Sequence, residues 1–366
     1  MCMDQDLVYL RTHAANPVGS SGLDPRALSP DDFYSQALAL GIKREVARRW
    51  AGAVIGRGEL CRDVIAKESQ ISKRFHQYVA DLPSLSLIKH LSSQSDGFEK
   101  IVLRTHDGLP VETVLIPLHK PGCVSVCVSS QVGCVMACDF CATGRMTQRR
   151  NLASWEILNQ LTHARRIVME QGRRVTGVVF MGMGEPFLNF HNVINAADWM
   201  RQPLENAISG KAITVSTVGL VREIEEFTDR NLPFRLSISI GAATDEKRAK
   251  LVPVAARTPL ARVLEAARRY ALVRGERINL AYVCISGENV GEEDAKALGA
   301  VIGDTPVRLD LIDVTDTSGK YRPPSPIERK AFRDALAKYV KQPVARRYSG
   351  GADIRASCGS LAGEPV

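Results

Sequence analysis

From Cys123 onward, short strand-like runs alternate with helical stretches, and no other feature of the sequence constrains the fold as strongly. Such alternation predicts a parallel sheet or barrel, because each helix returns the chain to the start of the next parallel strand. A closed eight-fold barrel needs eight units, whereas six or seven are present, so we expect an open, partial βα barrel of the α/β class. The strand-like runs are CVSVCVSS, TGVVFMG, ITVSTVG, RLSISI, INLAYVCI, VRLDLID and PVARRYS.

A small helical domain is expected before the barrel, in residues 25–97. Polar and apolar residues alternate at helical spacing through much of this region. Ser29 is a suitable helix cap, and Pro30 suits a first helical turn. Residues 1–24 are rich in Gly, Ser, Asn and Pro, and we expect them to be disordered or loosely attached.

A β-hairpin is expected in residues 98–117, where two strand-like runs flank Asp107-Gly108. Asp-Gly is a typical two-residue hairpin turn. The hairpin and the barrel together define a core over residues 98–366.

The bulk composition excludes several classes of protein. Of the 366 residues, 45% are hydrophobic, which suffices for a large core, but no apolar run is long enough to span a membrane. The N-terminus does not read as a signal peptide, so we expect a cytoplasmic protein without membrane contact. The net charge of +8 suits a polyanionic partner such as RNA as well as it suits a solvated basic surface. Arginines gather in residues 43–50 and 144–150.

The cysteine pattern indicates metal or redox chemistry rather than disulfides. An odd number of cysteines without a secretory signal argues against a disulfide framework. Five of the nine lie between residues 123 and 141. The full set is Cys2, Cys61, Cys123, Cys127, Cys134, Cys138, Cys141, Cys284 and Cys358.

Cys134, Cys138 and Cys141 form a CxxxCxxC motif directly after the first barrel strand, where such folds carry their active sites. Iron–sulfur clusters are usually held by four thiolates, so three from one tight loop leave one iron open. An open iron beside S-adenosylmethionine (SAM) can deliver an electron that cleaves it. The alternative is a zinc site completed by Cys127, but zinc motifs usually pair two distant CxxC units.

This motif is the hallmark of the radical SAM superfamily, and further motifs agree with that resemblance. GMGEP, residues 182–186, follows the second strand and includes Gly184 and Glu185. In the superfamily it binds the amino group of SAM. Ser216 and Ser239 end the third and fourth strands, where they are expected to bind the SAM carboxylate or ribose.

The local sequence resembles the RlmN/Cfr family more closely, over roughly residues 98–363. These are bacterial radical SAM methyltransferases of adenosine in 23S ribosomal RNA, and for some members also in transfer RNA. The helical region corresponds weakly to their RNA-binding accessory domain. The matching segments are CVSSQVGCVMACDFCATG, GMGEPFLN, DEKRAKLVP and ADIRASCGSLAG.

The resemblance implies a mechanism with two further cysteines and two SAM molecules per turnover. The cysteine matching Cys358 is first methylated, and a 5′-deoxyadenosyl radical then activates that methyl group for addition to C2 or C8 of adenine. The cysteine matching Cys127 resolves the crosslink and leaves a disulfide with Cys358. Glu112 matches a family glutamate associated with turnover, where a carboxylate can relay a proton.

Several positions depart from the family pattern and mark a divergent member. Gly241 stands where the family has histidine, and Thr315 replaces an asparagine that helps to bind SAM. Ala352 and Arg355 replace acidic residues near Cys358.

The sequence therefore predicts an RNA adenosine methyltransferase with a [4Fe–4S] cluster, reduced by a donor such as flavodoxin or ferredoxin, and acting as a monomer. The same mechanism on a small molecule or peptide is the second hypothesis. A cluster-bearing RNA-binding protein without catalysis is the third, although binding alone needs neither Cys127 nor Cys358.

Overall fold

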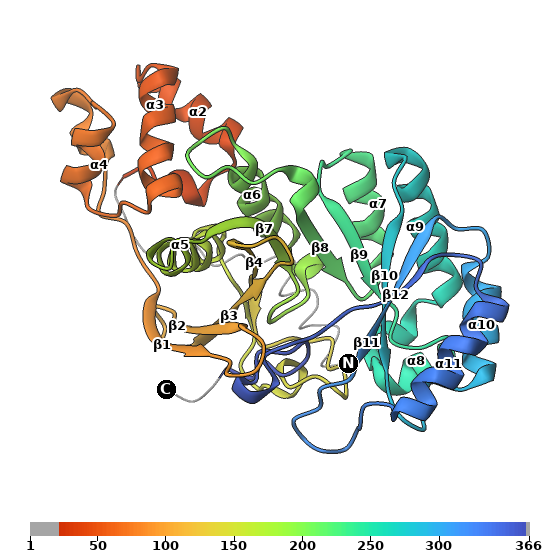
Figure 1. The fold of residues 1–366 in the computed structure, drawn as a ribbon. Coiled ribbons are helices and arrows are strands. Elements are labelled where there is room, and N and C mark those ends of the chain that lie inside the picture. Colours follow the sequence, from red (N-terminus) through yellow and green to blue (C-terminus); the bar gives the residue numbers. More distant parts are fainter. Residues whose placement is uncertain (1–21, 364–366) are drawn as a thin grey trace.

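The computed structural model describes residues 22–363, apart from the side chains of residues 255 and 256, and a ten-stranded sheet forms its core. The strand order is β1-β2-β3-β4-β7-β8-β9-β10-β11-β12 (Figure 1). Strands β1 to β4 pair antiparallel, and the pairs from β4 to β12 are parallel. The order is linear, so in the described residues the sheet stays open, as expected for a partial barrel.

The strands of the large sheet are β1 (Ser86–Ser92), β2 (Glu99–Arg104), β3 (Pro110–Pro117), β4 (Cys123–Cys127), β7 (Arg174–Phe180), β8 (Ile213–Thr217), β9 (Arg235–Ser239), β10 (Ile278–Cys284), β11 (Val307–Asp313) and β12 (Val344–Arg346). A separate antiparallel pair consists of β5 (Gln131–Val132) and β6 (Arg150–Asn151).

The helices are α2 (Pro30–Ala39), α3 (Arg44–Ala51), α4 (Arg62–Glu68), α5 (Ser154–Glu170), α6 (Phe190–Arg201), α7 (Val221–Asp229), α8 (Asp245–Leu251), α9 (Leu260–Arg274), α10 (Glu292–Ile302) and α11 (Pro326–Tyr339). A π-helical segment, Gly52–Arg57, continues α3. The 3₁₀ helices are Pro25–Ala27, Lys73–Tyr78, Thr143–Arg145, Pro186–Asn189, Gly210–Ala212, Pro253–Arg257 and Ala352–Ile354.

The barrel strands confirm the sequence pattern, since each of the seven predicted runs contains one parallel strand. The predicted hairpin is also present as β2 and β3, with Gly108 at φ 82° in the turn. β1 was not predicted. β1 lies in the region expected to be helical, and it pairs with β2. Most of its residues are exposed, so its sequence lacks the hydrophobic alternation by which a strand is recognised.

The helical region begins as expected but is more broken than its periodicity indicates. Ser29 caps α2 by accepting a hydrogen bond from the Asp32 backbone N–H at 3.1 Å. The chain then turns at Gly41, which has φ 81°, and again at Gln70, with φ 53°. Left-handed residues of this kind end helices, so the helical periodicity is divided among α2, α3, α4 and shorter turns. The expectation for the N-terminal segment falls mostly on residues 1–21, which lie outside the described residues.

The helical region is fixed to the outer face of the barrel by buried polar contacts. Arg26 pairs with Asp24 at 2.9 Å, both side chains being almost fully buried, and its guanidinium lies 5.5 Å from the ring centre of Trp155 in α5. Trp199 of α6 donates a hydrogen bond to the carbonyl of Leu28 at 2.8 Å. α2, α3 and α4 therefore project from one end of the molecule, beside α5 and α6 (Figure 1).

The last segment of the chain connects the two edges of the sheet. After β12 it runs back across the sheet to the β1–β3 strands (Figure 1). There Asp353 accepts a hydrogen bond from Gln94 N–H, and Asp96 accepts one from Gly351 N–H. No helix among residues 22–363 is long and apolar enough to cross a membrane.

Candidate active site

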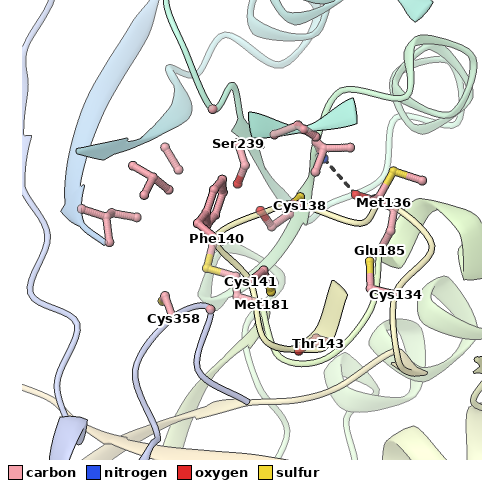
Figure 2. A pocket seen from close by; sticks show the side chains of 18 of the residues that line it. Cys134, Met136, Cys138, Phe140, Cys141, Thr143, Met181, Glu185, Ser239 and Cys358 are labelled. Carbon is pink, nitrogen blue, oxygen red and sulfur yellow. Dashed lines mark hydrogen bonds between the residues drawn. The ribbon is translucent and has the colours of Figure 1, made fainter. Parts of the chain in front are cut away.

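The carboxyl ends of the parallel strands surround one pocket, as expected for a sheet of this type. Four thiols, two carboxylic acids and several hydroxyl groups line it (Figure 2). Of the residues singled out in the sequence, the pocket brings together Cys134, Cys138, Cys141, Gly184, Glu185, Ser216, Ser239, Thr315 and Cys358. Cys127 and Glu112 lie outside this lining.

The cysteine loop is held in a tight, irregular conformation that exposes three thiols to the pocket. Ala137 has φ 48°, and Cys141 N–H donates to the Cys138 carbonyl at 3.0 Å. Gly144 N–H donates in turn to the Cys141 carbonyl at 3.1 Å. The backbone is thus fixed by short local bonds, and the three side chains project toward the same cavity (Figure 2).

The electrostatics of this loop suit a cationic metal cluster. Burial raises the pKa of Cys134 and Cys138 well above the ordinary value, and the neighbouring thiols raise it further. Thiolates so placed need positive charge beside them, which cluster iron supplies. Among the described residues, no three Cys, His, Asp or Glu side chains stand close enough together to hold a single metal ion.

The loop after β11 is held against the cysteine loop by polar contacts of two residues, Asp139 and Arg145. Asp139, inside the CxxxCxxC motif, accepts a hydrogen bond from Tyr321 Oη at 2.7 Å and pairs with Lys320. Arg145 pairs with Asp316 at 3.1 Å and donates to Thr317 at 3.0 Å. The loop that carries Thr315 therefore contacts the cysteine loop directly.

The GMGEP motif lines the pocket beside the cysteine loop. Gly184 has φ 102°, and a Cβ there would lie 2.6 Å from the Gln131 side chain, so the position requires glycine. Glu185 is 2% exposed, and its carboxylate accepts hydrogen bonds from Phe187 N–H at 3.0 Å and Val218 N–H at 2.9 Å. Burial outweighs these bonds and raises the pKa of Glu185 to about 7.

Ser216, Ser239 and Thr315 line the same pocket from three different strands or the loops that follow them. Gly241, with φ 73°, lies beside them in the lining. The pocket thus combines hydroxyl groups at the strand ends with apolar side chains and with the thiols of the cysteine loop. An arrangement of this kind can hold a ligand that carries charged, hydroxyl and apolar parts.

Cys358 reaches the pocket on a loop that is bonded to the cysteine loop. Its own N–H donates to Ser349 Oγ at 2.8 Å. The next carbonyl, that of Gly359, accepts from Ala142 N–H at 2.8 Å, and Thr143 Oγ1 donates to the Leu361 carbonyl at 2.6 Å. Two segments from distant parts of the sequence are therefore fixed side by side.

Cys127 lies behind Cys358 in a second, smaller cavity. This cavity measures about 80 Å³, against about 170 Å³ for the main pocket, and both cysteines line it. Cys127 ends β4 and is buried, and both thiols are free. Burial raises the pKa of Cys127 to about 12, with a further contribution from Cys358. Cys358 lines both cavities and so stands between Cys127 and the main pocket.

Glu112 is fully buried in β3, and its contacts lead to the Cys358 loop. It pairs with Lys100 at 3.4 Å, and its carboxylate accepts a hydrogen bond from Ala362 N–H at 3.2 Å. Lys100 also donates to the Arg355 carbonyl at 3.4 Å. The buried ion pair thus holds both ends of the segment that carries Cys358.

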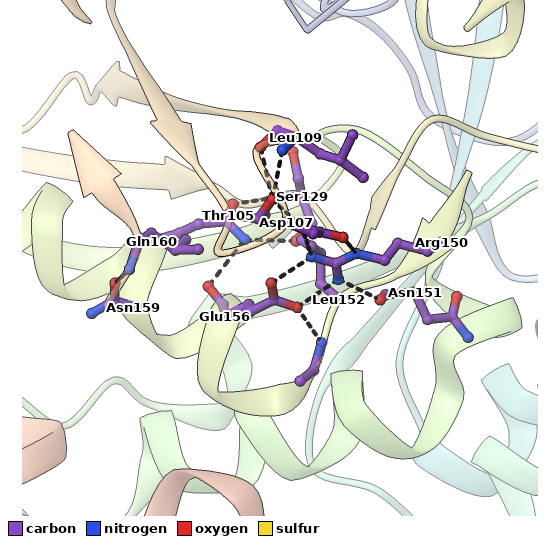
Figure 3. Close-up of polar contacts among 12 residues, drawn as sticks. Thr105, Asp107, Leu109, Ser129, Arg150, Asn151, Leu152, Glu156, Asn159 and Gln160 are labelled. Atoms are coloured by element: carbon purple, nitrogen blue, oxygen red, sulfur yellow. Dashed lines mark hydrogen bonds and ion pairs between the residues drawn. The ribbon is translucent and has the colours of Figure 1, made fainter. Parts of the chain in front are cut away.

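The arginines at residues 144–150 are mostly engaged within the protein. Arg150 makes paired hydrogen bonds at 2.7–2.8 Å with Asp107 in the hairpin turn and with Glu156 in α5 (Figure 3). Its guanidinium lowers the pKa of Asp107 to about 2. Arg145 is bound to the β11 loop, as described above. Arg149 is exposed and is the arginine of this stretch that remains open to a partner.

The arginines of α3 differ from one another in their exposure and in their contacts. Arg44 lies over the Tyr34 ring at 4.8 Å, and Arg49 is partly buried and donates to the Ser69 carbonyl at 3.1 Å. Arg48 is exposed. Of the three, Arg48 presents its charge to solvent, beside the hydroxyl group of Tyr34.

Arg347 is a site residue that the sequence reasoning missed. It lines both the main pocket and the small cavity, as Met181 and Leu361 also do. Its position directly after the last parallel strand was the available signal, because such positions face the active site. The run PVARRYS predicts a strand and does not by itself mark Arg347 as a site residue.

Comparison with known proteins agrees with this geometry. Residues 128–298 match the model of the radical SAM superfamily. The fold is similar to that of a radical SAM methyltransferase from Sphaerobacter thermophilus, with a TM-score of 0.83, 30% identity, and coverage of 93% of this chain and 99% of the other. The protein is therefore a radical SAM enzyme.

Curated relatives define the family more closely. A probable RNA methyltransferase of Myxococcus xanthus (strain DK1622) is 43% identical over 92% of this chain and 93% of its own length. The dual-specificity RNA methyltransferase RlmN of Anaeromyxobacter sp. (strain Fw109-5) is 36% identical over 93% of this chain and 91% of its own length. The chain belongs to the RlmN family of radical SAM methyltransferases.

Proposed function

We propose that this enzyme methylates C2 or C8 of an adenosine in 23S ribosomal RNA or transfer RNA, through a methyl group carried on Cys358. One observation supports this most directly. Cys127 and Cys358, which come from opposite ends of the barrel sequence, line one cavity beside the pocket that holds the three-cysteine loop. A fold that only bound a cluster would have no use for this second pair of thiols.

Cys134, Cys138 and Cys141 would hold the [4Fe–4S] cluster in this proposal, and SAM would occupy the adjoining pocket. Gly184 and Glu185 would bind its amino group, while Ser216, Ser239 and Thr315 would contact its carboxylate or ribose. When bound, cluster and SAM supply the 5′-deoxyadenosyl radical, with one electron drawn from reduced flavodoxin or ferredoxin. Two SAM molecules are consumed in each turnover, one as methyl donor and one as radical source.

Cys358 would accept a methyl group and present it to the radical source, because its loop is bonded to the cysteine loop. Adenine C2 and C8 are electron-poor and do not attack a methyl cation donor, so a carbon radical is needed. Cys127 would then break the bond between Cys358 and the product, leaving a disulfide. We assign Glu112 to holding the Cys358 loop through Ala362 rather than to proton relay, since its carboxylate is already committed to that contact and to Lys100.

An RNA substrate is supported by three features. The curated relatives are named RNA methyltransferases. The chain carries a net charge of +8, and phosphate contacts from Lys and Arg dominate affinity for nucleic acids. Arg149 near the pocket and Arg48 on α3 are exposed. We expect a monomeric enzyme in the cytoplasm, where RNA is available.

The deciding experiment replaces Cys127 with alanine. Methyl transfer to Cys358 and addition to the substrate need no second thiol, whereas resolution does. Cys127→Ala protein isolated from cells should therefore accumulate bound to its substrate, and mass spectrometry after nuclease digestion should find a nucleotide on the peptide that contains Cys358. That peptide is ASCGSLAGEPV, since trypsin cleaves after Arg355.

The matched control is Cys123→Ala, which removes another buried thiol from the same strand, β4. It should leave turnover intact and carry no adduct. Normal turnover by Cys127→Ala would contradict the two-cysteine mechanism. A small molecule or peptide found in place of the nucleotide would show that the same mechanism acts on a different substrate.

A further inference from the structure

We propose that Arg347 is a positioning residue that holds Cys127 as a thiolate during its attack on Cys358. The inference deepens the proposed function and rests on it. It concerns the resolution step alone and assigns no part in methylation of Cys358.

The placement of Arg347 is the first observation. It follows β12, and its backbone N–H donates to the Leu311 carbonyl of β11 at 2.9 Å, so the sheet edge fixes its position. Its side chain lines both cavities together with Cys358, and it lines the small cavity together with Cys127. Nη2 lies 3.0 Å from the sulfur of Met181, which also lines both cavities. The guanidinium is thus at the boundary where the two isolated thiols meet.

The charge of Arg347 is the second observation. The adjacent Arg346 pairs with Asp313 at 2.8 Å, whereas no carboxylate in the described part of the chain lies within ion-pair distance of Arg347. A guanidinium stays protonated in proteins, and a half-buried one without a counter-ion attracts any anion that forms nearby. The anion available in the small cavity is the thiolate of Cys127 or Cys358.

The need for such a cation follows from the burial of Cys127. Apolar side chains surround its thiol, including Phe98, Val114 and Ile116. Burial therefore raises the pKa of Cys127, and Arg347 opposes that rise. Each pKa unit changes the thiolate population tenfold, so removal of one nearby cation has a measurable effect on a thiolate reaction.

The chemical step is balanced without another reactant. Before resolution, Cys358 Sγ is bonded to a methylene group on the substrate ring. The Cys127 thiolate forms a bond to Cys358 Sγ, and the bond between that sulfur and the methylene carbon breaks. The electron pair of the broken bond stays with the carbon, which takes a proton and becomes the methyl group. The two thiols are oxidised to a disulfide as the carbon is reduced.

The test compares Arg347→Gln with Arg347→Lys and with Arg346→Gln as the matched control. We expect Arg347→Gln to carry methylated Cys358 at the wild-type level but to retain at least about tenfold more substrate adduct on the Cys358 peptide. Arg347→Lys keeps the charge and should retain far less adduct than Arg347→Gln. Arg346→Gln, whose charge is paired with Asp313, should resemble the wild type.

A second measurement needs neither cluster nor substrate. In protein that also carries Cys358→Ala, alkylation of Cys127 by iodoacetamide should be about tenfold slower with Arg347→Gln than with Arg347. Release of product at the wild-type rate by Arg347→Gln, equal alkylation rates, or loss of Cys358 methylation in this variant would each overturn the inference. Absence of methyl-Cys358 from the wild-type enzyme would instead overturn the proposed function.

Discussion

The two groups of thiols at this site are assembled in different ways. Cys134, Cys138 and Cys141 lie in one short loop that is fixed by hydrogen bonds of its own backbone. Cys127 and Cys358 come from the first barrel strand and the C-terminal loop, and they meet only because the chain returns across the sheet after β12. The first group depends on local geometry, and the second depends on the whole fold.

Under the proposed function, the local group binds the cofactor, whereas the distant pair of thiols sets the order of the reaction steps. A cluster must be held rigidly, and a loop of short hydrogen bonds achieves that with few residues. Two thiols that act in succession need separate environments, and here one faces the main pocket while the other lies behind it in a smaller cavity. Changes in the loop should therefore abolish all activity, whereas changes around the pair should stop individual steps.

The largest effect is expected from changes to the three thiols of the cysteine loop. Replacing Cys134, Cys138 and Cys141 with alanine removes the three proposed cluster ligands, so anaerobically purified protein should lose its brown colour and about four irons per chain. SAM cleavage, measured as 5′-deoxyadenosine by chromatography, should fall to background. Cys127→Ala should retain full iron content. Stoichiometric zinc with no iron in the wild-type protein would contradict the cluster assignment.

A large effect on the second group of thiols, centred on the Cys358 loop, is expected from Lys100→Met. It leaves Glu112 buried without its ion-pair partner, and breaking a buried pair in this way costs about 3–5 kcal/mol of unfolding free energy. It also removes the hydrogen bond to the Arg355 carbonyl. Hydrogen exchange should therefore rise in residues 355–362 more than in residues 134–141.

Urea unfolding and exchange mass spectrometry measure both effects. The control is the double variant Lys100→Met with Glu112→Leu, which removes both charges and should recover much of the lost stability. Unchanged exchange in residues 355–362 would show that the pair does not hold the Cys358 loop.

The same contrast explains what could be predicted from the sequence. The CxxxCxxC spacing, the seven strand runs and the hairpin turn are local patterns, and each one predicts its element. The contact between Lys100 and Arg355 and the position of Arg347 between two cavities depend on chain segments far apart, and no local pattern encodes them. β1 was missed because an exposed edge strand lacks alternation, and the helices broke at Gly41 and Gln70 because left-handed turns override helical periodicity.

A moderate effect is expected from Glu185→Gln. Since burial raises the pKa of Glu185 to about 7, its carboxylate is mostly neutral below that pH and charged above it. SAM affinity, measured by calorimetry on cluster-loaded protein, should therefore rise by up to about tenfold between pH 6 and pH 8, because the charged form attracts the ammonium group. Glu185→Gln should bind more weakly at pH 8 and lose this dependence, whereas exposed Glu225→Gln should keep it.

The raised pKa of Glu185 also affects the stability of the fold. SAM affinity should rise with pH, whereas this contribution to stability should fall with pH. The folded protein holds the Glu185 proton more tightly than the unfolded chain, so this group stabilises the fold below its ordinary pKa of 4.5. That contribution is lost as the pH rises through about 7. Protein without SAM should be less stable at pH 8 than at pH 6, and Glu185→Gln should reduce the difference. An equal pH dependence in the two proteins would contradict the assignment.

The smallest effect is expected at the helical region, which is remote from both groups of thiols and which we expect to contact RNA phosphates. Arg48 is exposed, whereas Arg49 is engaged with the Ser69 carbonyl, so the two adjacent arginines form a matched pair. Arg48→Gln should weaken binding to a fragment of 23S ribosomal RNA only a few-fold. The slope of log affinity against log salt should become shallower by about one unit or less, because one phosphate contact is lost. Arg49→Gln should lower the unfolding temperature and leave that slope unchanged. If Arg48→Gln leaves both affinity and slope unaltered, the helical region does not contribute this phosphate contact, and the charge that recognises RNA has to be sought around Arg149, near Cys134.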